Sequence, residues 1–375
     1  MKFICDQSEL VSALNIASKA ISSRSTLPIL KGILLSCNKE KGILKMSSSD
    51  LEISIDTCIS AHVEEDGEII VYAKLFSDII RKLNSGSVSF ELVEGNKLNI
   101  INGTYNSNIL GLEAEAEDFP KIEENAEGVS FSLEKEMLKD MIKGTSFAVS
   151  IDEVRGIITG TLLEIKKDEI CMVALDGFRM AIRREKVKSE EEKNIIIAGR
   201  IINEIGKLLS ENTKDDDITI KVSDNKAYFI MMDTVIVTKL MDGDFIKYKD
   251  IIPKESSISV LVNKRLLIDC VDRASIIGKE GNNAFIKFEI NEDELIISSR
   301  ADQGTTEEVL PVDKDGDNIK IGFNSRFMID ALKAIYDENI LMLFNMSVGP
   351  CLIKPVKGDS FEYLVLPVRL SSVDA

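Results

Sequence analysis

The sequence has no tryptophan and a single histidine, His62. A Ser-His-Asp or Cys-His mechanism would have to use His62 itself, and a zinc site would have almost no imidazole ligand. His62 follows a strand-like run beside a turn, where we expect an exposed side chain without a catalytic role. The six cysteines are scattered with no CxxC pair, which indicates buried thiols in a reducing compartment.

Other common signals are also missing. No stretch approaches the roughly 20 apolar residues of a membrane span, and the N-terminus does not resemble a signal peptide. We therefore expect a cytoplasmic protein with no membrane partner. The GxGxxG and GxxxxGK[ST] patterns are absent, so nucleotide binding has no support and no cofactor is expected. The net charge of -17 taken alone argues against nucleic acid as a partner.

The 375 residues suggest two to three domains, and 44% apolar residues are enough to build their cores. A strand followed by an amphipathic helix occurs three times. Its apolar positions are Phe3, Leu10 and Leu14, then Phe131, Leu138 and Ile142, then Val260, Leu267 and Val271. The spacing within each helix places these residues on one face. Asp6 and Asn263 are the expected N-caps of the first and third copies.

A second helix recurs at a constant spacing of 126 residues, beginning at Lys74, Arg200 and Arg326. Three aspartates, Asp50, Asp176 and Asp302, keep the same step. Alternating segments between the helices are typical of half-buried strands. We therefore predict an α+β chain of three similar domains, 1–126, 127–253 and 254–375, each with two helices packed on antiparallel sheets.

Charge is divided unevenly between the expected helices and the rest of the chain. The helices are predicted at 8–20, 74–83, 134–145, 200–210, 264–275 and 325–336. They hold 14 Lys and Arg against 9 Asp and Glu, whereas the remainder holds 32 against 54. A weakly basic helix set in an acidic chain suits helices that line a hole for DNA, with modest and salt-sensitive affinity. Helix surfaces can also be richer in lysine without any such role, and both interpretations remain open.

The size of such a hole indicates how many chains are needed. With helices packed 8–10 Å apart, a circle of six leaves a hole of about 6 Å, and a circle of twelve leaves about 23 Å. Groove depths imply a duplex roughly 20 Å across. One chain cannot encircle a duplex in this arrangement, but a homodimer can.

Seven motifs in this order resemble the bacterial DNA polymerase III beta subunit, the sliding clamp. They cover nearly the whole chain: SRSTLPILKGILL (23–35), DLEISI (50–55), EDFPKI (117–122), DEVRGIITGTLLEI (152–165), ALDGFRMAI (174–182), MDGDFIKYKDIIP (241–253) and EYLVLPVRL (362–370). The resemblance implies the DNA-clamp fold in a head-to-tail dimeric ring of six similar domains. It implies a processivity factor that encircles double-stranded DNA without regard to sequence and performs no catalysis.

Family clamps bind short peptides of the QLxLF type from the replicative DNA polymerase, the clamp loader and other replication and repair proteins. The peptides bind in a groove between the second and third domains. The matching positions here are mostly apolar, as a peptide groove requires. They are Val154, Ile158, Gly160, Leu175, Gly177, Phe178, Arg179, Met180, Tyr248, Ile251, Leu364, Val365, Leu366, Pro367, Val368 and Arg369.

Some positions depart from the family pattern. Ile246 replaces a frequent proline, Asp250 replaces an arginine of some relatives, and Phe178 replaces a common histidine. Gly156 and Ile157 stand where some relatives have aromatic DNA contacts. Residues 371–375 extend beyond the usual end, so we expect that this tail can shade the groove.

The resemblance also points to DNA and dimer contacts. The DNA residues are Arg24, Lys74, Arg81, Lys82, Lys139, Arg155, Arg200, Lys207 and Arg326. For the dimer it points to a strand meeting a helix end, through Tyr105, Ile109, Leu110, Ile276 and Ile277.

Two other functions compete with this interpretation. A metal-dependent phosphotransferase would need the three repeated aspartates to converge, whereas a residue that recurs once per domain is spread over three domains; turn caps explain them better. The segment 313–318, DKDGDN, resembles a calcium loop but has its glycine fourth rather than sixth, so a hairpin turn is expected and no metal site. A repeat scaffold that binds only proteins is the other alternative; a scaffold need not close, whereas a clamp must.

Overall fold

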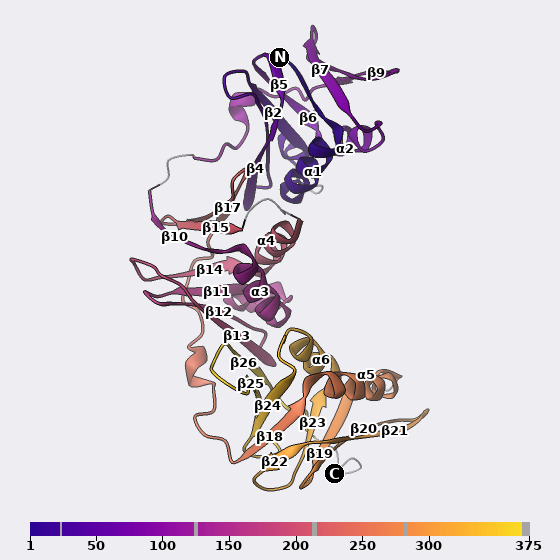
Figure 1. The fold of residues 1–375 in the computed structure, drawn as a ribbon, viewed down its shortest axis with the longest axis vertical. Helices are drawn as coiled ribbons and strands as arrows, with labels where there is room; N and C mark the ends of the chain where they lie inside the picture. Colours follow the sequence, from indigo (N-terminus) through magenta and orange to yellow (C-terminus); the bar gives the residue numbers. More distant parts are fainter. Residues whose placement is uncertain (23–24, 124–126, 212–215, 281–283, 370–375) are drawn as a thin grey trace. The chain divides into compact units, whose positions relative to one another are not determined.

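The computed structural model describes all residues except 23–24, 124–126, 212–215, 281–283 and 370–375. Helices and strands follow one another in the same order three times along the chain (Figure 1). Each described strand pair is antiparallel. The predicted α+β class and the order strand, helix, strands, helix, strands are therefore confirmed.

The first repeat has two helices, α1 (Gln7–Ala17) and α2 (Ala73–Ile80). Its strands are β1 (Lys2–Asp6), β2 (Gly32–Asn38), β3 (Ile43–Ser49), β4 (Ile53–Ser60), β5 (His62–Glu65), β6 (Gly67–Tyr72), β7 (Ser87–Val93), β8 (Lys97–Asn102) and β9 (Tyr105–Leu110).

The second repeat has α3 (Lys135–Thr145) and α4 (Gly199–Glu211). Its strands are β10 (Val129–Glu134), β11 (Gly160–Ile165), β12 (Glu169–Leu175), β13 (Arg179–Lys186), β14 (Lys193–Ala198), β15 (Asp217–Val222), β16 (Lys226–Ile230) and β17 (Thr234–Lys239).

The third repeat has α5 (Lys264–Glu280) and α6 (Ser325–Lys333). Its strands are β18 (Ile258–Asn263), β19 (Phe285–Ile290), β20 (Glu294–Ala301), β21 (Gly304–Pro311), β22 (Asp313–Asp315), β23 (Ile319–Asn324), β24 (Asn339–Phe344), β25 (Cys351–Pro355) and β26 (Phe361–Val365).

Side-chain caps begin several of these helices. Asp6 Oδ1 accepts from the backbone N–H of Ser8 at 2.8 Å, and Asn263 Oδ1 accepts from that of Leu266 at 3.1 Å. Both predicted caps are confirmed. Asn324 caps α6 in the same way, with its Oδ1 2.9 Å from Arg326 N. These bonds satisfy backbone donors that have no partner within the helix.

The chain forms two compact units, and the division passes through the second repeat. One unit is Met1–Lys135 with Lys207–Leu240, and the other is Glu136–Gly206 with Met241–Ala375. The first contains the sheets β5-β1-β7-β8-β9 and β10-β15-β16-β17-β4-β3-β2-β6. The second contains β14-β11-β12-β13-β26-β25-β24-β18-β22 and β21-β20-β19-β23.

Each unit has an apolar core between helices and sheets. In the first unit, the Phe3 and Phe90 rings stack with centroids 4.6 Å apart, and Leu10, Leu14 and Phe76 are buried in the same cluster. In the second unit, the buried faces of α5 and α6 pack with the third repeat's strands. Five of the six cysteines are buried, Cys58 is half-buried, and all are free. The predicted buried thiols are thus confirmed except at Cys58.

Two repeats meet where the edge strand of one repeat pairs with the edge strand of the next. In the first unit β4 pairs with β17, and the Thr57 and Thr234 hydroxyls hydrogen-bond across them at 2.9 Å. In the second unit β13 pairs with β26, with Arg179 opposite Val365. These two strand pairs, which we call the joints, make one continuous sheet out of parts of two repeats.

An ion-pair ladder crosses the second joint. Arg184 on β13 and Lys354 on β25 bind opposite oxygens of the Glu362 carboxylate on β26, at 2.6 and 2.8 Å. Burial alone would raise the pKa of Glu362, but the two cations outweigh it and hold this pKa below the ordinary value of 4.5. The ladder therefore ties three adjacent strands together while Glu362 is ionised.

The aspartates at the 126-residue step act as turn caps where the structure defines their bonds. Asp50 Oδ1 accepts from Glu52 N and Ile53 N at 3.0 and 2.9 Å. Asp176 does the same one repeat later. The prediction for 313–318 was wrong in one respect: this segment is no hairpin, because β22 pairs with β18 and β23 pairs with β19. It carries the chain from one sheet to another, with Gly316 at a φ of 100°.

We predict that Glu362→Gln lowers the stability of the second unit by about 2 kcal/mol at pH 7, because charge-assisted hydrogen bonds to a buried carboxylate are lost. The folded-state pKa is depressed, so this contribution is complete above pH 4.5 and is lost as pH falls below it. Calorimetric melting of wild type and variant should therefore converge in acid. The exposed pair Lys226–Glu123 supplies the control, Glu123→Gln, which should melt like wild type. A constant difference between wild type and Glu362→Gln at all pH values would contradict the prediction.

Candidate functional site: an apolar surface at the second joint

The turn between β12 and β13 presents an aromatic ring to solvent. Asp176 Oδ1 accepts from the backbone N–H groups of Phe178 and Arg179 at 2.9 and 3.0 Å. Gly177, between Asp176 and Phe178, has a φ of 88°, a backbone conformation that residues with a side chain rarely adopt. This fixed turn leaves Phe178 49% exposed.

The segment after β26 is fixed beside this turn by two backbone hydrogen bonds. Leu366 N donates to Phe178 O at 2.9 Å, and Val368 N donates to Gly322 O on β23 at 2.8 Å. Leu366 and Val368 are 38% and 44% exposed. The structure thus brings together two segments about 190 residues apart that the sequence assigned to one site.

The predicted peptide-binding residues divide into a buried floor and an exposed set. Ile158, Leu175, Met180, Tyr248 and Leu364 are buried in one apolar cluster. Gly160 and Val365 are also buried, Pro367 is half-buried and Arg369 is exposed. The large exposed apolar members, which we call the apolar rim, are Val154, Phe178, Ile251, Leu366 and Val368.

A buried polar group fastens the segment that carries Tyr248 and Ile251. The Tyr248 hydroxyl donates to Glu164 Oε2 at 2.7 Å, and Lys249 Nζ lies 3.2 Å from the same carboxylate. Burial and the neighbouring Cys171 and Glu164 raise the pKa of Tyr248, so the phenol stays protonated and remains a donor. Burial raises the pKa of Cys171 to about 11, so this thiol is uncharged and unreactive near neutrality.

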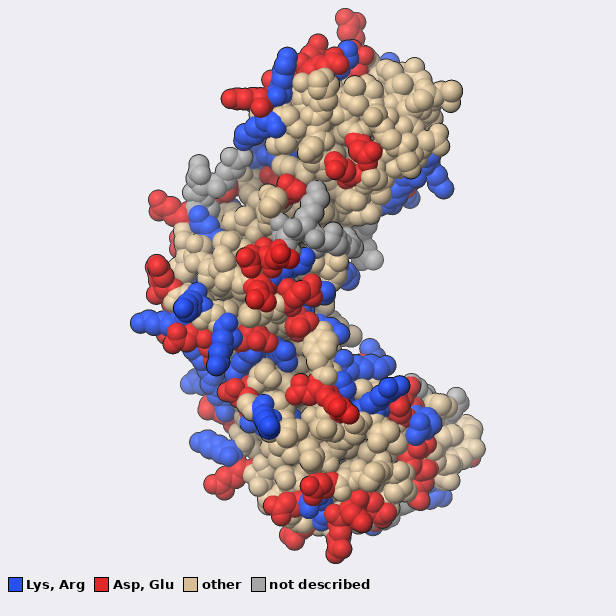
Figure 2. Space-filling model, in the orientation of Figure 1, with Lys and Arg blue, Asp and Glu red and all other residues tan. Residues whose placement is uncertain are grey.

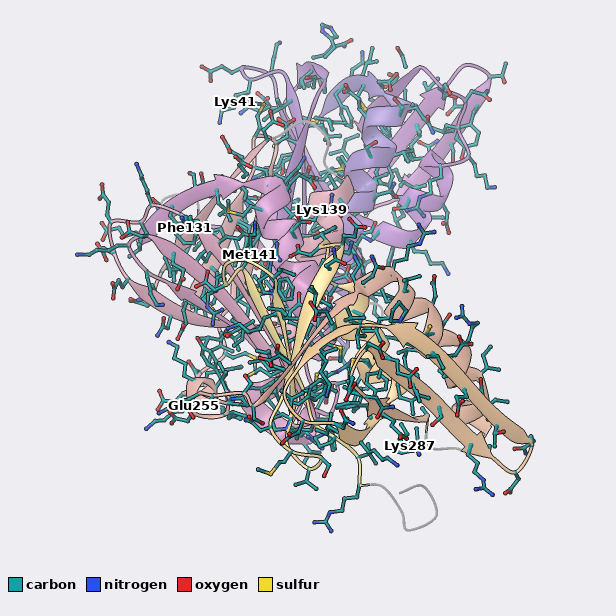
Figure 3. All side chains as sticks on the ribbon, turned by 60° about the horizontal axis from the view of Figure 1, so that its bottom comes forward. Lys41, Phe131, Lys139, Met141, Glu255 and Lys287 are labelled. Atoms are coloured by element: carbon teal, nitrogen blue, oxygen red, sulfur yellow. The ribbon has the colours of Figure 1, made fainter. Side chains whose placement is uncertain are left out.

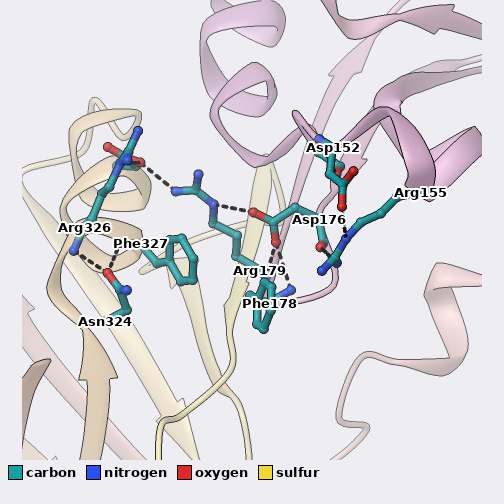
Figure 4. Close-up of polar contacts among 10 residues, drawn as sticks. Asp152, Arg155, Asp176, Phe178, Arg179, Asn324, Arg326 and Phe327 are labelled. Carbon is teal, nitrogen blue, oxygen red and sulfur yellow. Dashed lines mark hydrogen bonds and ion pairs between the residues drawn. The ribbon is translucent and has the colours of Figure 1, made fainter. Parts of the chain in front are cut away.

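Arg179 joins the second and third repeats beneath the rim (Figure 4). Its Nε lies 3.1 Å from Asp176 Oδ2 and its Nη1 lies 2.7 Å from Asp330 Oδ2 on α6. The guanidinium also lies 4.6 Å from the centroid of the Phe327 ring. Its side chain is only 9% exposed. Arg179, predicted as a peptide contact, is thus largely engaged within the protein.

Arg155 lies at the apolar rim although the sequence analysis assigned it to DNA. Its guanidinium is 5.2 Å from the Phe178 ring centroid, and one Nη donates to the carbonyl of Asp176. Asp152 lies 3.6 Å from its Nε. Figure 4 shows these groups on the side of Asp176 away from α6. Nearby Gly156 has a φ of 60°, which kinks the segment Glu153–Thr159 and leaves Val154 93% exposed.

The other predicted DNA residues are distributed over several helices. Lys74, Arg81, Lys82, Arg200, Lys207 and Arg326 are exposed, whereas Lys139 is half-buried. Lys139 lies on α3, where Figure 3 labels it, and Met141 two residues on is fully buried on the other side of the helix. Arg24 lies outside the described residues. On the face shown in Figure 2, acidic side chains are scattered among basic ones without a broad area of one sign.

Three of the predicted dimer residues lie on the edge strand β9, and the other two lie on α5. Tyr105 and Leu110 on β9 are 38% and 56% exposed, whereas Ile109 is 5% exposed and faces its own core. Ile276 near the end of α5 is 63% exposed, and Ile277 is half-buried. β9 and β21 are each the last strand of a sheet.

The sequence analysis missed several residues at this site. Phe327 stacks on Phe178 with ring centroids 5.9 Å apart, and Asp330 holds Arg179. Cys351 at the start of β25 pairs with Val365. The start of α6 was a repeated landmark, so comparison of the three helix starts could have drawn attention to Phe327.

Of the departures from the family pattern, Ile157 is half-buried and the others are exposed. Ile246 is 40% exposed, and Asp250 is exposed beside Ile251. The tail 371–375 lies outside the described residues. Among the described residues, no group of three His, Cys, Asp or Glu side chains is arranged to hold a metal ion. None of the helices that the structure describes is both long enough and apolar enough to cross a membrane.

Comparisons with known proteins agree with this architecture. Three family models match in order: the N-terminal domain of the DNA polymerase III beta subunit at residues 1–123, its central domain at 132–247 and its C-terminal domain at 249–369. A beta sliding clamp of Staphylococcus epidermidis is 33% identical over 98% of this chain and 99% of the relative. The crystal structure of the sliding clamp from Bacillus subtilis has a TM-score of 0.94 at 28% identity, covering 99% of this chain and all of that one. A Pseudomonas aeruginosa sliding clamp bound to griselimycin has a TM-score of 0.91 at 27% identity over the same shares.

Three copies of one helix-and-sheet unit joined edge to edge define the class of DNA clamps. Within that class the chain belongs to the DNA polymerase III beta subunit family, the beta sliding clamps, whose members are processivity factors of DNA replication and not enzymes.

Proposed function

We propose that this chain forms a homodimeric ring around duplex DNA and tethers the replicative polymerase, the clamp loader and repair proteins through the apolar rim. In this proposal the domains are 1–126, 127–253 and 254–375, and the ring works in the cytoplasm. The observation that carries the proposal is that both joints use corresponding strands. The same strand pairing could therefore connect the third repeat of one copy to the first repeat of another.

The two joints within the chain follow the same rule. The last strand of one repeat's sheet, β4 or β13, pairs antiparallel with the last strand of the following repeat, β17 or β26. By the repeat order, β21 of the third repeat corresponds to β4 and β13, and β9 of the first corresponds to β17 and β26. Both are open edges. If β21 of one copy paired with β9 of a second copy, both edges would gain a partner. If β21 of the second copy also paired with β9 of the first, the two copies would close a ring.

Side chains at the two open edges favour such a pairing. Leu110 on β9 and Val309 on β21 are 56% and 55% exposed, and Ile276 lies on the helix that packs against β21. Arg273 on α5 binds Glu308 of β21 through two hydrogen bonds at 2.6 and 2.8 Å, which holds the strand against the helix. Exposed apolar residues on an ordered edge are typical of an interface.

We predict that Leu110→Glu combined with Val309→Glu shifts the protein from dimer to monomer at micromolar concentration, because each new carboxylate would have to leave water in the edge contact. Light scattering coupled to size exclusion measures the mass directly. Val356→Glu, a similarly exposed valine in the turn after β25, is the control and should remain dimeric. A wild type that is monomeric, or a double variant that remains dimeric, would contradict the β9–β21 pairing.

The predicted DNA residues fit a weak and sequence-independent contact. Lys74 and Lys82 are exposed on and just after α2. Other predicted cations already have partners within the protein: Arg81 donates to Asn15 at 2.8 Å, and Lys139 binds Glu136 at 2.7 Å. Because Arg81 already uses a donor and Glu136 offsets the charge of Lys139, the lining would attract phosphates without holding them firmly.

We predict that rings loaded by the cognate clamp loader stay on nicked circular DNA and are lost once the circle is cut. Topological linkage does not depend on affinity, so only the free end releases the ring. Lys74→Glu with Lys82→Glu should reduce loading, whereas Lys357→Glu in the exposed turn after β25 should not. Gel filtration of labelled protein on both DNA forms is the measurement, and equal retention on circles and linear molecules would favour ordinary surface binding instead.

The apolar rim suits short peptides with leucine and aromatic side chains. It presents exposed apolar groups over a buried apolar floor, with polar backbone groups of the turn and tail beside them. A Pseudomonas aeruginosa member of this family binds griselimycin, which supports the proposal that this chain also has a ligand-binding surface.

We predict that Phe178→Ala or Leu366→Ala weakens binding of a fluorescein-labelled QLSLF peptide at least tenfold, since loss of a buried anchor contact typically costs about 2 kcal/mol. Fluorescence anisotropy gives the dissociation constants, and Val356→Ala is the matched control. Both substitutions spare the buried floor. Deletions from Leu364 or a lysine at Met180 are unsuitable probes, because both residues are buried in the second joint. Unchanged affinity in both rim variants would exclude this surface.

A further inference from the structure

Asp330 lies on α6 behind the apolar rim and has an ion pair that the predicted site did not include. Its Oδ2 is 2.7 Å from Arg179 Nη1, while its second cation, Arg326, is 77% exposed and 4.0 Å away. Arg179 is the better partner, because its guanidinium is close and largely shielded from water.

The Arg179 guanidinium supports a pair of aromatic rings. It lies 4.6 Å from the centroid of Phe327, one turn before Asp330 on α6. The Phe327 ring stacks on Phe178 at 5.9 Å with an interplanar angle of 25°. Contacts therefore connect Asp330 to Arg179, Arg179 to Phe327, and Phe327 to Phe178, the exposed ring of the rim. Figure 4 shows the last three of these residues.

We propose that Asp330 is a positioning residue for partner binding: it holds Arg179 against Phe327 and thereby fixes the ring on which Phe178 rests. This inference rests on the proposed peptide-binding function of the rim. Without the Asp330 carboxylate, Arg179 keeps Asp176 as its ion-pair partner and the Phe147 ring at 5.5 Å, and turns toward them, so Phe327 loses its cation–π partner. A peptide would then have to order both rings on binding, at a cost in side-chain entropy.

The first test measures peptide affinity in the full-length protein. Asp330→Ala should weaken binding of the labelled QLSLF peptide about tenfold, and Asp330→Glu, which retains a carboxylate, should recover part of that loss. Arg326→Ala removes the other cation near Asp330 and should bind like wild type. An Asp330→Ala variant that binds as tightly as wild type would overturn the inference.

Two controls separate positioning from simple destabilisation. Adding Asp330→Ala to Phe178→Ala should weaken peptide binding by less than a further twofold, because the effect of Asp330 depends on the Phe178 ring. A further tenfold loss in the double variant would overturn the inference. Glu362→Gln loosens the same joint through a different ion pair. It should lower the melting temperature and leave peptide affinity unchanged, and a loss equal to that of Asp330→Ala would assign Asp330 a merely structural role.

A peptide-free measurement keeps the inference independent of the proposed function. The chain has no tryptophan, so Phe178→Trp introduces a single fluorescent reporter at the rim. Adding Asp330→Ala should lower the steady-state anisotropy of that indole, whereas adding Arg326→Ala should not. If the wild-type protein binds no peptide, the function proposed for the rim is refuted. The anisotropy of the indole would still test the role of Asp330, and an anisotropy unchanged by Asp330→Ala would overturn that role.

Discussion

Antiparallel pairing between the last strands of successive repeats is the contact on which the rest of the structure depends. Strand edges left open would expose rows of unpaired backbone groups, and here β4–β17 and β13–β26 satisfy them within the chain. At the second joint the pairing also places Phe178 beside Leu366, so one hydrogen-bond ladder both connects two repeats and builds the apolar rim. Loss of this backbone pairing would therefore affect the connection and the partner site together.

The same geometry at the first joint carries different side chains, which explains why the rim is found at only one of them. Lys239 N donates to Glu52 O at 3.1 Å, the counterpart of the bond from Leu366 N to Phe178 O. An acidic and a basic residue thus replace the two apolar ones. Leu51 occupies the place of Gly177 and adopts a φ of 74°, so the turn itself is preserved. The backbone is common to both joints, and the side chains at a few positions decide which one can take an apolar peptide.

Much of the fold could be predicted from the sequence because its signals are local. Helix periodicity and the Asp6 and Asn263 caps depend on residues close together in the chain, and the 126-residue spacing needs only a comparison of three such local patterns. The joint between β13 and β26 could not be predicted in register, since it pairs residues about 186 apart. The same reason hid Asp330, whose partner Arg179 is 151 residues away. DKDGDN was misread as a hairpin because a turn sequence does not reveal whether the following strand returns to the same sheet.

Site prediction was limited in another way: residue type and motif identify a position but not the direction of its side chain. Arg155 matched a basic DNA position, yet its guanidinium lies over Phe178. Ile109 matched a dimer position, yet it faces its own core while Leu110 is exposed. In a strand, alternate residues face opposite sides, so a shift of one residue changes an interface contact into a core contact.

Weak attraction to DNA and firm attachment of partners are compatible in the proposed ring because they depend on different groups. Lys139 is paired with Glu136, and this ion pair raises the lysine's pKa while it offsets the charge available to a phosphate. A closed ring needs no tight phosphate contact, since the duplex cannot leave sideways. The partner peptide is not enclosed by the ring, so the rim must hold it through surface contacts alone. This difference fits the place of the Arg179 ion pairs and the Phe178–Phe327 stack at the second joint, where a fixed surface lowers the entropy cost of binding a flexible peptide.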